Sequence, residues 1–186
     1  MIDLIRGLEI TVADSSVGTL VRGQSGMESV FRYCEGVNAE NAVSLTMSAR
    51  MENYGWERGV HPIFEMNLPE GALRDELIRR FGEAVRDFDA FALLAIVGSS
   101  QLGRLAVACE SFTDHQPETL LSDLLIHDGV HGLFDDLLHK HGQYSGVSGV
   151  QPKVLVRDGV TAALYPIHRG STHLVKAFRP EEFPEL

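Results

Sequence analysis

A glycine-bearing turn that runs into a strand organises this chain: Tyr144-Ser-Gly-Val-Ser-Gly-Val-Gln-Pro-Lys153-Val-Leu-Val156. A second strand is predicted at 171–178, where Lys176 stands among apolar residues. Backbone amides approach a phosphate closely only where side chains are absent, which suits Gly146 and Gly149. A loop, a strand and a lysine on the next strand form the arrangement with which kinases hold the phosphates of a nucleotide. Taken alone, the loop fits a plain hairpin turn better than a phosphate cradle, and Lys176 fits an exposed edge strand equally well.

The composition is that of an ordinary globular protein with an acidic balance. The 186 residues include 16 basic and 26 acidic side chains, for a formal net charge of −10, and 44% are hydrophobic. Without a basic run, direct binding to nucleic acid or to an anionic membrane is disfavoured, although an acidic chain can join a DNA-bound complex through a basic partner. Cys34 and Cys109 lack a CxxC spacing, and no signal peptide is recognisable. The two isolated cysteines indicate a reduced protein. Since no apolar run reaches the roughly 18–20 residues of a membrane span, we also expect a cytoplasmic one.

The first third of the chain predicts antiparallel strands with one buried face, because apolar and polar residues alternate and glycines punctuate the pattern. The expected strands span 8–12, 19–22, 27–33 and 42–47, with turns at 15–18 and 23–26.

Helices and a further strand are predicted next. After an apolar loop at 62–69 bracketed by prolines, a helix at 70–81 is expected, since its apolar residues share one face. A second helix, 88–96, would take Asp87 as its N-cap, and a strand would follow at 104–108. Residues 109–117 read as a linker, and helical spacing of leucines predicts two short helices at 118–127 and 132–141.

One histidine pair has a spacing that suits metal ligands. His127 and His131 are four residues apart and could share a helical face. Gly129 weakens that helix, Asp128 stands where the zinc-protease motif has glutamate, and no third ligand is indicated. We therefore predict solvated histidines and no metal site.

Taken together and in order, several segments resemble the HipA family of bacterial toxin kinases, and the resemblance covers nearly the whole chain. The N-terminal matches are Val17-Gly-Thr-Leu20, Phe31-Arg-Tyr33, Pro62-Ile-Phe-Glu-Met-Asn-Leu-Pro-Glu-Gly-Ala-Leu-Arg74, and Phe91-Ala-Leu-Leu-Ala followed by Val97-Gly98. The C-terminal matches are Ser148-Gly-Val-Gln-Pro-Lys153, similar to a Ser/Ala-Gly-Val/Ala-Gln-x-Lys loop, and Thr172-His-Leu-Val-Lys176, similar to a Thr-His-Ile-hydrophobic-Lys strand.

The resemblance implies an α+β architecture in three parts. A small, antiparallel, β-rich N-terminal domain with packed helices would span 1–108. A linker with two short helices would span 109–141. The glycine loop and lysine strand that begin a kinase-like N-lobe would span 142–186.

The resemblance also implies a set of site residues. Lys176 would contact the phosphates, and the loop would cover the nucleotide. The family phosphorylates itself on a loop serine, and here Ser148 is the first candidate and Ser145 the second. The chain departs from the best-known pattern at Gly146, where that pattern has its serine, and at Ser99, where the family usually has an acid. The implied nucleotide-binding residues are Ser148, Gly149, Val150, Gln151, Lys153 and Lys176.

Cofactors and partners follow from the same resemblance. Full-length family members use ATP and magnesium, phosphorylate aminoacyl-tRNA synthetases and are neutralised by a DNA-bound helix-turn-helix antitoxin. In a three-gene variant the N-terminal domain is a separate protein that restrains the kinase. The sequence leaves open whether this chain alone binds ATP.

The catalytic aspartates and asparagine of a kinase are not found after Lys176, where only Ala-Phe-Arg-Pro-Glu-Glu-Phe-Pro-Glu-Leu follows. We therefore expect no phosphoryl transfer by the chain alone. Two hypotheses remain: it is the N-terminal part of a HipA-like serine/threonine kinase toxin, or it is a stand-alone regulator that binds a separate kinase or an antitoxin.

Overall fold

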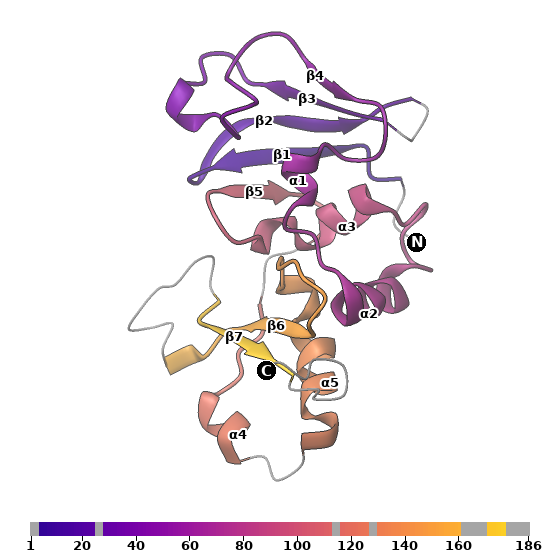
Figure 1. Ribbon diagram of the computed structural model, residues 1–186, viewed down its shortest axis with the longest axis vertical. Helices are drawn as coiled ribbons and strands as arrows, with labels where there is room; N and C mark the ends of the chain where they lie inside the picture. Colours follow the sequence, from indigo (N-terminus) through magenta and orange to yellow (C-terminus); the bar gives the residue numbers. More distant parts are fainter. Residues whose placement is uncertain (1–3, 25–27, 113–115, 127–129, 161–170, 178–186) are drawn as a thin grey trace.

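The computed structural model describes residues 4–24, 28–112, 116–126, 130–160 and 171–177. The predicted α+β class is confirmed. A five-stranded antiparallel sheet lies at one end of the molecule, and a two-stranded sheet with two helices lies at the other (Figure 1). The larger sheet has the order β4-β3-β2-β1-β5. Its strands are β1 (Gly7–Val12), β2 (Ser15–Arg22), β3 (Ser29–Tyr33), β4 (Tyr54–Trp56) and β5 (Leu105–Ala108).

The first hairpin turns earlier than expected. Ala13 and Asp14 both have positive φ, +47° and +62°, as in the two-residue turns that suit the twist of a hairpin. The predicted turn at 15–18 is therefore wrong, because these residues already belong to β2. Gly18 serves close packing instead, since a Cβ there would collide with the carbonyl oxygen of Arg32 on β3.

The strand predicted at 42–47 is also wrong. A single 3₁₀ turn, η1 (Ala39–Asn41), precedes a compact loop in which only Ser44 and Met47 form an isolated bridge. The hydroxyl of Tyr33 holds this loop, accepting the Val43 N–H at 2.8 Å and donating to the carbonyl of Met47. β4, which completes the sheet, was not predicted.

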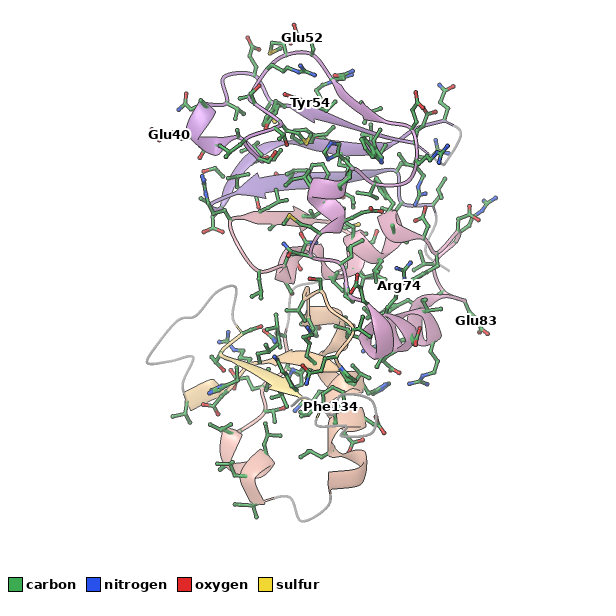
Figure 2. All side chains as sticks on the ribbon, viewed as in Figure 1. Glu40, Glu52, Tyr54, Arg74, Glu83 and Phe134 are labelled. Carbon is green, nitrogen blue, oxygen red and sulfur yellow. The ribbon has the colours of Figure 1, made fainter. Side chains whose placement is uncertain are left out.

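Helices α1 (Pro62–Glu65) and α3 (Ala90–Val97) and the 3₁₀ turn η2 (Gly98–Ser100) lie along one side of this sheet, whereas α2 (Gly71–Phe81), which carries the labelled Arg74, lies farther away, next to the C-terminal part (Figures 1 and 2). α1 replaces the loop predicted at 62–69, since Pro62 suits the first helical turn and His61 Nδ1 accepts the Ile63 N–H at 3.2 Å. α3 is apolar on all sides and buried from Phe91 to Val97, as expected of a helix at the centre of a core. Its N-cap is Asp89, and not the predicted Asp87.

The C-terminal part contains α4 (Leu121–Ile126), α5 (Val130–His141), the 3₁₀ turn η3 (Gly142–Tyr144), β6 (Lys153–Val156) and β7 (His173–Lys176). The predicted strand pair is confirmed, and β6 and β7 are antiparallel. One continuous buried core joins this part to the N-terminal helices: Gly142 packs against Leu73 and Leu77 of α2. In the part of the chain that the structure describes, no helix is long and apolar enough to span a membrane.

Candidate functional site

Lys153 and Lys176 stand directly opposite each other in the smaller sheet. Facing pairs in an antiparallel ladder alternate between hydrogen-bonded and non-hydrogen-bonded. The pair next to the lysines, Pro152 and Ala177, is hydrogen-bonded, because the Ala177 N–H donates to the Pro152 carbonyl at 2.9 Å. The neighbouring lysine pair is therefore of the non-hydrogen-bonded kind, in which Cα atoms lie only about 4.5 Å apart and side chains share a face. The register thus places two ammonium-bearing side chains next to each other.

The two lysines have no acidic partner in the described ranges. The chain has three lysines in all, and the third, Lys140, lies on α5. Among the described residues, no carboxylate forms a salt bridge with either Lys153 or Lys176. Like charges directly opposite each other destabilise a sheet, so an anion bound between these side chains would relieve their repulsion.

The loop before β6 is shaped around Lys153. Gly149 has φ +107°, a conformation that residues with a side chain rarely adopt. The ammonium of Lys153 occupies the space where a Cβ at residue 149 would stand. The glycine therefore permits both the turn and the close approach of the charged side chain to the loop backbone.

The same loop lies against the N-terminal part of the chain. Gly146 forms an isolated bridge with Gln101, and its carbonyl accepts the Leu102 N–H at 3.4 Å. Four residues later, the Val150 carbonyl approaches Gly71 at the start of α2. The loop is thus a link between the larger fold and the lysine pair, and not a free hairpin turn.

The two candidate serines differ sharply. Ser145 is fully buried; its hydroxyl donates to the His141 carbonyl and accepts the Leu155 N–H, both at 2.8 Å. Ser148 is exposed. Only the Ser148 side chain is accessible in this conformation, and phosphorylation of either serine stays a prediction.

On the edge of β6 that faces away from β7, the backbone groups of Leu155 are both hydrogen-bonded by side chains. The Leu155 N–H is bound by Ser145, and the Leu155 carbonyl accepts from Gln116 Nε2 at 3.3 Å. The Gln116 amide nitrogen also lies 3.0 Å from the hydroxyl of Ser171, two residues before β7 begins. Gln116 therefore connects β6 to the segment that leads into β7, a role that sequence reasoning missed because residues 109–117 read only as a polar linker.

A buried histidine supports the same region. His141 Nε2 lies 2.8 Å from the Thr119 hydroxyl, which also accepts from the Lys140 ammonium at 2.7 Å. His141 Nδ1 is buried without a hydrogen-bond partner in the described structure. Burial, and then the neighbouring Lys140 charge, lower the pKa of His141 to about 4, so its ring is neutral near neutral pH.

The structure brings together some of the predicted site residues and separates others. Gly149, Lys153 and Lys176 gather at one place, as the strand register and the loop contact show. The Val150 side chain is exposed and Gln151 is half-buried, on the part of the loop that faces α2. No signal in the sequence could have placed Gly71 beside this loop.

The described residues lack the arrangement of side chains that a metal site requires. Among them, no group of three or more histidine, cysteine or acidic side chains is arranged to hold a metal ion. His127 lies outside the described residues, so the prediction for the pair of His127 and His131 stays a prediction.

Comparison with known proteins adds one finding. The sequence model of the HipA N-terminal domain matches residues 8–108, which is more than half of the chain. The match runs from the second residue of β1 to the last residue of β5, and so includes the five-stranded sheet and the helices α1, α2 and α3. No curated protein matches the chain in a sequence search.

Proposed function

Because the chain belongs to the HipA N-terminal domain family, we propose that it is the N-terminal portion of a HipA-like serine/threonine kinase toxin from a bacterial toxin–antitoxin system. In this role the chain supplies the loop at 145–153 that covers ATP and the lysine that contacts its phosphates. The catalytic groups come from a lobe that is not among these 186 residues, on the same or a separate polypeptide.

The lysine pair is the observation that carries this proposal. Lys153 and Lys176 face each other without a carboxylate partner in the described ranges, and Gly149 leaves room for the loop backbone to lie beside them. A chain of phosphates carries the charge that two adjacent ammonium groups would neutralise, and exposed backbone amides at a glycine can donate to its oxygens. Bound ATP would supply the phosphoryl group, and the residues of this chain would hold and cover it.

Binding of magnesium–ATP to the purified chain, measured by calorimetry, tests the proposal. Lys153→Met and Lys176→Met should each weaken binding about tenfold or more, since each removes one charge from the phosphate site. Lys140→Met removes the same charge from α5 and is the matched control. The proposal fails if the wild-type chain does not bind ATP, or if all three variants bind like the wild type.

Incubation with radiolabelled ATP and magnesium tests whether phosphoryl transfer requires a separate catalytic lobe. The chain alone should incorporate no phosphate, because it lacks the acids that a kinase needs. Addition of a kinase lobe from the same system should label Ser148, and Ser148→Ala should abolish that labelling. Clear labelling of the chain alone would show that catalytic groups have been overlooked here.

A second function rests on the extent of the family match, which covers the N-terminal domain and no kinase segment. In this alternative the chain is a stand-alone regulator that docks on a separate kinase or on a DNA-bound helix-turn-helix antitoxin. A regulator of this kind would bind its partner equally well after Lys176→Met. Loss of ATP binding without loss of partner binding would separate the two roles.

A further inference from the structure

We propose that Gly71, in the N-terminal domain, is a positioning residue that sets the place of the Lys153 ammonium through the glycine loop. The inference rests on the proposed phosphate-binding function of that loop. It gives a role to the Pro69-Glu-Gly71 segment, which the phosphate site itself does not use.

The contact at Gly71 is one that only glycine allows. A Cβ at residue 71 would lie 2.7 Å from the Val150 carbonyl oxygen, closer than real Cβ atoms approach other atoms, and this neighbour is backbone. Gly71 also has φ +51°, in the left-handed region. The residue is the first of α2, and its N-cap Glu70 makes no side-chain hydrogen bond to the helix end.

A second attachment holds the other end of the loop. At Gly146 a Cβ would lie 2.6 Å from the Gln101 backbone nitrogen, and the Gly146 carbonyl accepts the Leu102 N–H. Both attachments are made by backbone atoms and both need a glycine. The segment between them is therefore held at both ends.

Lys153 responds to this segment directly. Its ammonium lies against the backbone of Gly149, which stands between the two attachments. A side chain at residue 71 would push the Val150 carbonyl away, and the adjacent Gly149 would move with it. The loop would then no longer support the Lys153 ammonium opposite Lys176.

Gly71→Ala in the full chain tests the idea, with Gly36→Ala as matched control. Gly36 also has a positive φ, +78°, but a Cβ there would meet nothing within 4 Å, so its substitution adds backbone strain alone. We expect amide hydrogen exchange across 146–152 to speed up about tenfold in Gly71→Ala, and affinity for inorganic triphosphate to fall by a similar factor. Gly36→Ala should change neither.

Two further variants keep the test decisive. If Gly71→Ala fails to fold, Gly71→Asn takes its place, because asparagine tolerates the left-handed conformation and still introduces the Cβ. In a Lys153→Met background, Gly71→Ala should weaken triphosphate binding no further, because Gly71 acts through Lys153. Additive losses, or loop exchange like that of Gly36→Ala, would overturn the proposal. A different outcome separates the two proposals. If the loop exchanges faster in Gly71→Ala but the wild type binds no triphosphate, the phosphate-binding function is wrong, whereas the role of Gly71 in holding the loop is supported.

Discussion

The guanidinium of Arg22 and the carboxylate of Asp89 form a two-pronged ion pair that fastens β2 to the amino end of α3. One prong joins Arg22 Nη2 to Asp89 Oδ1 at 2.8 Å, and the other joins Nη1 to Oδ2. The guanidinium also lies 4.6 Å from the centre of the Phe91 ring, while Asp89 accepts the Ala92 N–H at 3.0 Å as the helix cap. Burial alone would raise the pKa of Asp89, but the hydrogen bonds and charge of Arg22 hold it below its ordinary value.

Substitutions at Asp89 should separate its two roles. Asp89→Asn keeps a good capping side chain but removes the negative charge from this ion pair, and the Arg22 side chain is only 5% exposed. We expect a loss of about 2 kcal/mol in the free energy of unfolding, less than for a fully buried pair because the Asp89 side chain is 41% exposed. Asp89→Ala should lose about 1 kcal/mol more, since the cap is also removed. Urea denaturation at pH 7 measures both; equal losses would show that the cap contributes nothing.

The buried imidazole of His141 should make the protein sensitive to mild acid. Burial lowers its pKa to about 4 in the fold, whereas an unfolded histidine titrates near its usual value of about 6.5. Between these values the unfolded chain binds more protons, so stability falls as pH drops from about 6.5 towards 4, by roughly 3 kcal/mol at most. Urea denaturation at several pH values measures this slope. His141→Gln should flatten it, and an unchanged slope in that variant would assign the effect to other groups.

The two loop serines should behave differently when the hydroxyl is removed. Ser145→Ala leaves the Leu155 N–H buried without its 2.8 Å partner, which should cost about 1–3 kcal/mol. Ser148→Ala should stay within about 0.5 kcal/mol of the wild type, because that side chain is exposed. Thermal denaturation of the two variants side by side provides the comparison. A large loss in Ser148→Ala would mean that its hydroxyl has a structural partner in solution.

The facing lysines should cost the free protein stability. Lys176→Met removes one of two like charges that stand opposite each other, so it should stabilise the chain by up to about 1 kcal/mol in low salt. The gain should shrink in about 1 M salt, which screens the repulsion. Denaturation of Lys176→Met and Lys140→Met at both salt concentrations measures the effect. A destabilised Lys176→Met would mean that a counter-charge already pairs with this residue.

Local patterns predicted the elements whose stability is mainly local. The alternation through β1 and β3 and the apolar face of α2 are visible in sequence because each element buries one side. The same patterns failed at 42–47, which alternates like a strand. That segment is held as a loop by the hydroxyl of Tyr33, a residue about ten positions away, and no local rule contains such a contact.

The candidate site could be predicted only in part for a similar reason. The sequence predicts Lys153 in the loop and Lys176 on a strand, whereas Lys153 is the first residue of β6, and no local pattern specifies the register that sets the two lysines opposite each other. The contacts of Gly71 and Gln101 with the loop are still less predictable. They are made by backbone atoms, so they place no requirement on the sequence other than a glycine at the point of contact. Glycine patterns predict turns, whereas Gly18 and Gly146 mainly permit close packing.

The unbroken core has a practical consequence for how this protein can be divided. The family match ends at residue 108, yet Leu73 and Leu77 of α2 pack against Gly142 of the following segment. A chain cut after residue 108 would leave those leucines facing water. Such a truncated product should bind a fluorescent hydrophobic dye and precipitate readily, whereas the 186-residue chain should not. We therefore expect the physically separable folding unit to extend beyond the boundary that the sequence match defines.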